Sequence, residues 1–180
     1  RYACHATDYR RCEHLFNLTE QQLMMQKLFR EVAQNEVKEN AADVDENERF
    51  PKESVEVMRQ AKMLGIPYSR EYGGAGADYL CYILAIEELS KTCATSGVVL
   101  SAHTSLGTWP IAQFGTEEQK QRFLTDLCTG KKLAAFGLTE PNAGTDAAGQ
   151  QTTAILEGDN YILNGSKISR TRKSFPRVMD

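Results

Sequence analysis

Near its carboxyl end this 180-residue chain carries the run Phe136-Gly137-Leu138-Thr139-Glu140-Pro141-Asn142-Ala143-Gly144-Thr145-Asp146. The apolar residues that lead into it, 133–136, suit a buried β-strand, and Pro141 ends the ladder because it has no backbone N–H. Gly144 has no side chain, so the main chain there can come close to a ligand. The run therefore predicts a strand that ends in a turn rich in backbone N–H groups.

The same turn carries hydroxyl groups on Thr139 and Thr145, which donate or accept hydrogen bonds. N–H groups and short hydroxyls together suit a flat heterocycle and a phosphate. On spacing alone, an ordinary strand followed by a turn at Pro141 and Asn142 explains the run equally well. The order of the residues favours the first interpretation.

That order resembles the flavin-binding signature of the acyl-CoA dehydrogenases. Upstream, Glu71-Tyr72-Gly73-Gly74-Ala75-Gly76-Ala77-Asp78-Tyr79 resembles a loop of the helical domain of the same family. The segments Ser101-Ala102-His103-Thr104-Ser105-Leu106 and Trp109-Pro110-Ile111 look most like the short-chain, butyryl-CoA type. The resemblance runs from about Leu18 to Ile168.

The resemblance implies a mainly α fold made of the family's N-terminal domain and part of its middle domain. We expect a helical bundle over residues 18–130 and the first strands of a truncated antiparallel β domain over residues 131–168. The segments 1–17 and 169–180 lose the family pattern and are expected to be atypical tails.

The resemblance also implies an FAD-dependent oxidation of a short-chain acyl-CoA, of the butyryl-CoA type, to the 2,3-enoyl-CoA. Electrons would pass to an electron-transferring flavoprotein, and the parent enzyme would be a homotetramer. The residues implied in cofactor binding are Phe136, Leu138, Thr139, Gly144 and Thr145, and those implied in substrate binding are Thr145, Thr104 and Leu106.

No catalytic residue is expected in this chain, because the general base of the family belongs to a C-terminal region that is absent here. Glu140 and Asp146 match no such base, and we assign both to turn chemistry. After Ile168 the family continues with an aromatic residue, Ile, Thr and Asn, whereas this chain has the basic run Ser169–Ser174. Thr171 in that run is a poor substitute for the family's threonine.

We therefore expect the chain to be a gene or reading-frame fragment that neither retains FAD nor oxidises butyryl-CoA by itself. Within enzymes, an acyl-CoA oxidase or a branched-chain relative is the alternative. Outside enzymes, the alternative is a non-catalytic helical module that binds acyl-CoA or a protein partner.

Composition limits other functions. The 24 acidic and 21 basic residues form no clustered basic stretch, which argues against nucleic-acid binding. The five cysteines contain no C-x-x-C pair, so neither a metal site nor a disulfide framework is indicated. The uncharged segment Thr92–Thr116 is interrupted by polar residues and falls short of the ~20 apolar residues of a membrane span. Without a recognisable presequence, we expect the bacterial cytoplasm, with the mitochondrial matrix as the alternative.

Local signals predict most helices. A capping box at Thr19 begins a helix that runs to about Val37, and the acidic stretch Glu39–Glu48 is expected to form a helix end and linker. A second helix begins at Pro51 and is expected to end at Gly65.

Asp78 is expected to cap a helix that runs to about Thr92, in which Glu87 or Glu88 faces solvent. His103 is predicted to be a satisfied core or surface histidine without a catalytic partner, and Trp109 to be a core residue. The Gly-rich loop after Pro67 is predicted to be a tight interhelical turn. A second capping box begins at Thr116, and a Gly158-Asp159 turn predicts a hairpin between residues 153 and 164.

Overall fold

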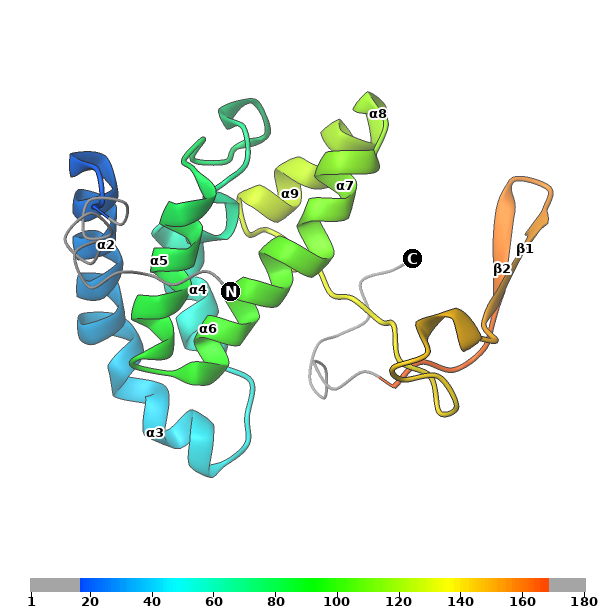
Figure 1. The fold of residues 1–180 in the computed structure, drawn as a ribbon, viewed down its shortest axis with the longest axis horizontal. Helices are drawn as coiled ribbons and strands as arrows, with labels where there is room; N and C mark the ends of the chain where they lie inside the picture. The colour runs from blue at the N-terminus through cyan, green and yellow to red at the C-terminus, as the bar shows by residue number, and fades with distance from the viewer. Residues whose placement is uncertain (1–16, 169–180) are drawn as a thin grey trace, which may run out of the picture.

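The computed structural model describes residues 17–168, and the tail segments 1–16 and 169–180 lie outside them. The described part is mainly helical and ends in one short antiparallel hairpin, as expected (Figure 1). A bundle of helices occupies one side of the molecule, and an extended segment leads from it to the hairpin. None of the helices between residues 17 and 168 has the length and apolar character that crossing a bilayer requires.

The first helical column extends further than the sequence predicted. Helix α2 spans Glu20–Val32 and is followed by the π-helical segment η2, Ala33–Val37, and by α3, Lys38–Glu46. The predicted capping box at Thr19 is present. The expected linker at Glu39–Glu48 is wrong, because Val44 on α3 is buried and keeps most of that acidic stretch helical.

The second column also differs at its end. Helix α4 spans Lys52–Gln60 and stops before the 3-10 turn η3, Met63–Gly65, so the predicted end at Gly65 is wrong. Lys62 adopts a left-handed conformation with φ 55°, which turns the chain so that Met63 and Leu64 are fully buried. The Gly-rich loop includes the 3-10 turn η4, Arg70–Tyr72, and is a tight turn as predicted, since a Cβ at Gly74 would lie 2.2 Å from the Tyr68 carbonyl oxygen.

Helix α5, Tyr79–Ser90, packs between α2 and α6, Ala94–Ser101. Asp78 caps α5 as predicted, because its carboxylate accepts a hydrogen bond from the Cys81 N–H at 2.8 Å. Glu87 faces solvent, whereas Glu88 is buried at 2 % exposure.

The buried Glu88 joins α5 to α2. Both of its carboxylate oxygens accept hydrogen bonds of 3.0 Å from the Arg30 guanidinium, and Lys91 lies 3.1 Å away. Hydrogen bonding from Arg30 lowers the pKa of Glu88 despite its burial, so the carboxylate remains charged.

The remaining helical segments form one long column and a second, shorter one that follows it in the chain. The long column continues from α6 through the π-helical segment η5, Ala102–Thr108, into α7, Trp109–Phe114. The shorter column consists of α8, Glu117–Gln119, η6, Lys120–Leu124, and α9, Thr125–Cys128. Thr116 forms the second predicted capping box.

The core lies between these columns. Its fully buried apolar side chains come from the long helices, from η3 and from the residue after it, and the large ones include Phe29, Met58, Met63, Leu64, Ile66, Leu89 and Leu100. Trp109 is not among them, so its predicted core position is wrong. Its ring is 38 % exposed and packs edge-on against Phe114, with ring centroids 5.5 Å apart.

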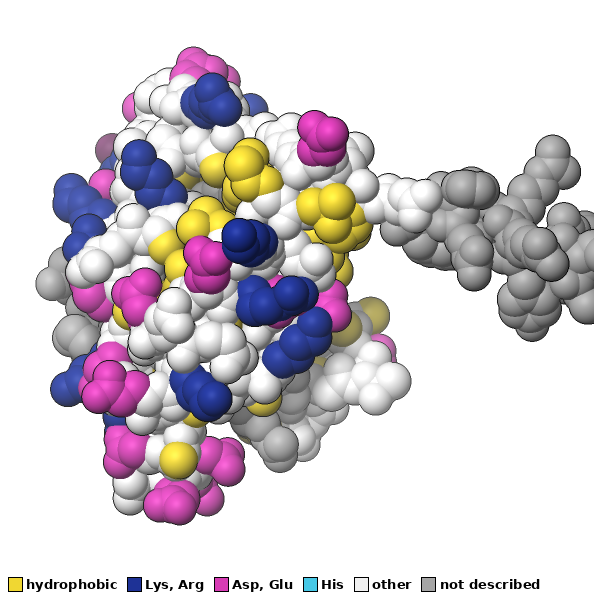
Figure 2. All heavy atoms as spheres, turned by 90° about the vertical axis from the view of Figure 1, so that its left-hand side faces the viewer, with side chains coloured by type: hydrophobic (Ala, Val, Ile, Leu, Met, Phe, Trp, Pro, Cys, Tyr) yellow, Lys and Arg dark blue, Asp and Glu magenta, His cyan; other side chains and the backbone are white. Residues whose placement is uncertain are grey.

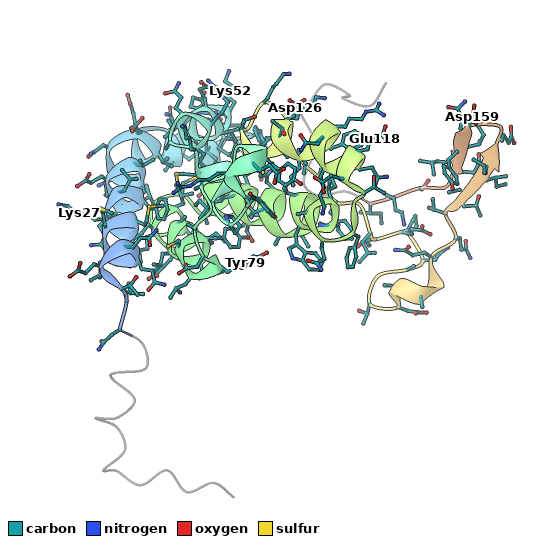
Figure 3. The ribbon with its side chains drawn as sticks, turned by 90° about the horizontal axis from the view of Figure 1, so that it is seen from above. Lys27, Lys52, Tyr79, Glu118, Asp126 and Asp159 are labelled. Carbon is teal, nitrogen blue, oxygen red and sulfur yellow. The ribbon has the colours of Figure 1, made fainter. Side chains whose placement is uncertain are left out.

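The hairpin stands apart from the helices. Strand β1, Thr153–Glu157, pairs antiparallel with β2, Asn160–Asn164, around the predicted Gly158-Asp159 turn, and a 3-10 turn, η7, Ala147–Gly149, precedes them. Every residue of both strands is exposed. Asp159 at the turn lies far from Tyr79 on α5, and the hairpin has no neighbouring strand in the described chain (Figure 3).

Candidate functional site

Two of the three residues implied in substrate binding, Thr104 and Leu106, lie on the π-helical segment η5. π-Helical turns are rare and often occur at functional sites. Thr104 is 1 % exposed, and its carbonyl oxygen accepts a 2.5 Å hydrogen bond from the Tyr68 hydroxyl. Its own hydroxyl is buried and has no partner in the described chain, whereas Leu106 points outward and is about half exposed. An unpartnered buried hydroxyl is costly, which makes Thr104 the most unusual polar group of this helix.

His103, beside Thr104, is the predicted structural histidine. It is buried, and its Nδ1 accepts a hydrogen bond from the Ala134 N–H at 3.0 Å. Its Nε2 lies 3.2 Å from the Leu127 carbonyl oxygen on α9, so Nε2 carries the proton and donates it there. Burial lowers the pKa of His103 to about 4, and the imidazole is therefore neutral near pH 7.

Gly107 brings the same helix against the chain that leads to the signature run. A Cβ at Gly107 would lie 2.2 Å from the Ala134 Cβ, far inside van der Waals contact. His103 and Gly107 therefore hold Ala134 directly against η5. This close approach agrees with the small residues that the sequence places in the segment Thr92–Thr116.

The signature run does not continue as a strand. Residues 133–136 have no strand pairing, and Phe136 and Leu138 are 44 % and 40 % exposed, so the predicted buried strand is wrong. A strand needs a neighbour to pair with, and the described chain supplies none here. Glu140 and Ala143 instead close the turn through two reciprocal backbone hydrogen bonds of 3.0 and 3.1 Å.

Glu140 organises this turn from within. Its buried carboxylate accepts hydrogen bonds from the N–H groups of Gln151 and Thr152 at 2.7 and 3.1 Å, and from the Lys167 ammonium at 2.8 Å. These donors, Lys167 first, lower the pKa of Glu140 to about 2. The assignment of Glu140 to turn chemistry agrees with this geometry, because all its contacts tie chain segments together.

The remaining signature residues are exposed and present mainly donors. The carbonyl oxygen of Leu138 is taken by Gln150 and Lys167, and that of Thr139 by the Ile168 N–H. Within residues 17–168, the N–H groups of Leu138 and Thr139 and the hydroxyls of Thr139 and Thr145 have no hydrogen-bond partner. Gly144 is open, since a Cβ there would meet nothing within 4 Å.

In the structure the predicted site residues therefore form two groups that lie apart from each other. Thr104 and Leu106 belong to the helical bundle, whereas Gly144 and Thr145 lie on the loop beyond the extended segment (Figure 1). Ala134 connects the two groups. The sequence did not indicate that His103 and Gly107 hold this connection, because their contact with Ala134 depends on tertiary packing.

Comparison with known proteins shows the family to which this chain belongs. Residues 19–131 match the family model described as the acyl-CoA dehydrogenase N-terminal domain. The match covers more than half of the chain, which therefore belongs to the acyl-CoA dehydrogenases, a family of oxidoreductases.

One curated relative is the short-chain specific acyl-CoA dehydrogenase of Clostridium acetobutylicum, 61% identical over 153 residues, which cover 85% of this chain and 40% of that protein. The solved structure of butyryl-CoA dehydrogenase from Megasphaera elsdenii is 46% identical, with a TM-score of 0.80, over 85% of this chain and 41% of that one. An acyl-CoA dehydrogenase from Bacillus anthracis, solved in complex with FAD, is 36% identical with a TM-score of 0.77 over 84% of this chain and 26% of that one. This chain spans about 40% of the length of the curated relatives that it matches first.

Proposed function

We propose that this chain is the N-terminal part of an FAD-dependent acyl-CoA dehydrogenase that oxidises a short-chain acyl-CoA, of the butyryl-CoA type, to the 2,3-enoyl-CoA. The observation that carries the proposal is the 61% identity to a short-chain specific enzyme, which extends over 85% of the chain. The exposed donors of the signature run support it, because a cofactor is recognised by a few well-placed polar groups.

The donor set of this run fits FAD. The free N–H groups of Leu138 and Thr139 suit the carbonyl and nitrogen acceptors along the edge of a flavin, and the hydroxyl of Thr139 adds a third donor. Gly144 and Thr145 suit a phosphate, because one leaves room for close approach and the other offers a hydroxyl. The exposed ring of Phe136 supplies an apolar surface. When bound, the flavin supplies the acceptor for the hydride lost by the substrate.

The acyl group belongs beside η5 in this proposal. Thr104 and Leu106 lie on a helix without charged side chains from Ala94 to Phe114, which suits a short apolar chain. Thr145 would contact the acyl-CoA from the loop side. Glu140 is not the general base in this proposal, since its carboxylate is bound by Lys167 and the backbone.

By themselves, these 180 residues are not expected to retain FAD. The cofactor would rest on exposed main chain without a covering strand, and a hairpin with two exposed faces is marginally stable. The protein should therefore be purified without a flavin absorbance band and should not reduce a dye with butyryl-CoA. Calorimetric titration with FAD and with butyryl-CoA adds a second criterion, since acyl-CoA binding without flavin binding would favour a non-catalytic helical module.

The proposed activity itself is tested in a chimera. Residues 19–168 of this chain replace the matching residues of the Clostridium acetobutylicum enzyme, which supplies the remaining length. We expect the chimera to bind FAD and to reduce an artificial electron acceptor with butyryl-CoA. A well-folded chimera that binds FAD but is inactive with butyryl-CoA, and active with a longer or branched acyl-CoA, would overturn the substrate assignment.

The partners follow from the same proposal. An electron-transferring flavoprotein would take the electrons, and the full-length protein would be a homotetramer. A location in the bacterial cytoplasm, with the mitochondrial matrix as the alternative, stays a prediction.

A further inference from the structure

One buried side chain forms hydrogen bonds at the junction between the helical bundle and the signature run. His103 is 1 % exposed and binds two partners that belong to different parts of the chain. Its Nε2 faces the Leu127 carbonyl oxygen at 3.2 Å, and its Nδ1 faces the Ala134 N–H at 3.0 Å. A single imidazole therefore links α9 to the first residues of the signature segment.

The two hydrogen bonds require one tautomer of a neutral ring. The Ala134 N–H is a donor, so Nδ1 must be the acceptor and Nε2 must carry the proton. The Thr108 hydroxyl, which lies 3.5 Å from Nε2, donates its own proton to the His103 carbonyl oxygen at 2.8 Å. Because burial lowers the pKa of His103 to about 4, the ring is neutral near pH 7, and the two hydrogen bonds select its tautomer.

Other contacts also lie at the junction: the Lys132 N–H donates a 3.0 Å hydrogen bond to the Asp126 carbonyl oxygen, and Leu133 packs against the helical core. Asp126 on α9, labelled in Figure 3, pairs with Lys131 and Lys132 at 3.4 and 3.2 Å, but both lysines are about half exposed or more. Surface pairs of this kind contribute little. Gly107 sets how closely Ala134 approaches but supplies no hydrogen bond. His103 is thus the only side chain in residues 17–168 that binds the main chain of Ala134.

The position of Ala134 is passed on to the donors of the signature run. Leu138 lies four residues further along, which is at most roughly 14 Å of extended chain. Residues 133–136 have no strand pairing, so the hydrogen bond between His103 and Ala134 fixes the main chain at residue 134 relative to η5. A shift at Ala134 would move the N–H groups of Leu138 and Thr139 relative to Thr104.

We infer that His103 is a positioning residue: it fixes the start of the signature run on the helical bundle through both ring nitrogens. Its consequence for flavin binding rests on the proposed function, but the anchoring of Ala134 does not. His103 is not among the residues proposed to contact the cofactor or the substrate, so its proposed role is positional.

Two substitutions separate the two hydrogen bonds. In His103→Asn the side-chain oxygen can take the place of Nδ1 and accept from Ala134, but the side chain is too short for Leu127. In His103→Gln the amide reaches toward Leu127 but leaves no acceptor at the Nδ1 position. Ser105→Ala is the matched control, because its exposed hydroxyl lies on the same helix and, within residues 17–168, bonds only to the Ser101 carbonyl oxygen.

The first measurement is amide hydrogen exchange in the 180-residue chain, with circular dichroism to confirm that each variant stays helical. We expect exchange at Ala134 to accelerate about tenfold or more in His103→Gln, and to stay close to the unsubstituted rate in His103→Asn and Ser105→Ala. Nitrogen-15 chemical shifts should show a protonated Nε2 and an unprotonated Nδ1. Equal acceleration in both His103 variants, unchanged exchange in His103→Gln, or a protonated Nδ1 would overturn the inference.

The second measurement is FAD affinity in the chimera described above. His103→Gln should weaken it about tenfold, equivalent to about 1.4 kcal/mol, and His103→Asn should restore most of it. If the unsubstituted chimera binds no FAD, the proposed function fails, whereas hydrogen exchange still decides the anchoring. If FAD binds equally to all variants while Ala134 opens only in His103→Gln, the positioning role is overturned.

Discussion

The Lys167 ammonium donates a 2.8 Å hydrogen bond to the buried carboxylate of Glu140, and this contact joins the signature run to the segment that follows the hairpin. Lys167→Met should remove it while keeping most of the side chain's length. We expect faster amide exchange at Gln151 and Thr152, whose N–H groups share the same carboxylate. Exchange in α5 should not change, because the contact lies outside the helical core, and a loss of protection there would contradict this account.

The same carboxylate predicts a local dependence on pH. Because the pKa of Glu140 is lowered to about 2 from an ordinary 4.5, its contribution is fully present above pH 4.5 and is lost as the pH falls toward 2. Protection of the Thr152 amide should follow this window. In Glu140→Gln the window should disappear, and a wild-type pH dependence in that variant would assign the titration to another group.

The lowered pKa of His103 predicts that the free energy of unfolding changes over a different pH range. Its folded-state pKa of about 4 lies below the ordinary 6.5, so the contribution is fully present above pH 6.5 and is lost as the pH falls toward 4. The difference corresponds to about 3.5 kcal/mol at most, since one pKa unit is about 1.4 kcal/mol. Urea unfolding between pH 7 and pH 4, compared with His103→Asn, isolates this term. Parallel curves for the two proteins would contradict it.

The buried core of the helical bundle should provide most of the stability of the chain. Leu89→Ala removes a fully buried side chain and should lower the free energy of unfolding by about 2 to 5 kcal/mol. Leu23→Ala on the exposed side of α2 is its control and should change it by less than about 0.5 kcal/mol. Figure 2 shows the face that includes α2, where hydrophobic side chains lie among charged ones. Similar losses in both variants would mean that the core is misplaced.

Substitutions at two glycines test packing and cofactor binding separately. Gly107→Ala places a methyl group 2.2 Å from the Ala134 Cβ and should destabilise the junction, seen as faster exchange at Ala134. Gly144→Ala meets nothing within 4 Å and should leave stability unchanged. In the chimera, Gly144→Ala should nevertheless weaken FAD binding, because the main chain there can no longer approach the phosphate as closely. Unchanged FAD affinity would remove Gly144 from the proposed site.

Local signals in the sequence predicted the features that local hydrogen bonds decide. The capping boxes at Thr19 and Thr116, the cap at Asp78 and the Gly158-Asp159 turn all form between residues a few positions apart. The end of α4 was missed because Lys62, a residue without preference for positive φ, takes the left-handed conformation that the core demands.

The sequence predicted which residues belong to the candidate site but not how they are arranged in space. The resemblance named the signature run, but residues 133–136 form no strand, since pairing depends on a neighbour that the described chain does not supply. The partners of Glu140 and His103 lie 11 to 31 residues away along the chain, and no spacing in the sequence marks such contacts. These contacts determine where the predicted donors lie relative to η5.

Anaerobic addition of butyryl-CoA to the FAD-loaded chimera tests the central proposal most directly. If residues 19–168 supply one face of a short-chain acyl-CoA dehydrogenase site, the absorbance of the oxidised flavin should fall on addition of one equivalent of butyryl-CoA, and 2,3-enoyl-CoA should form. A chimera that binds FAD stoichiometrically and keeps its full oxidised-flavin absorbance with butyryl-CoA would contradict the account.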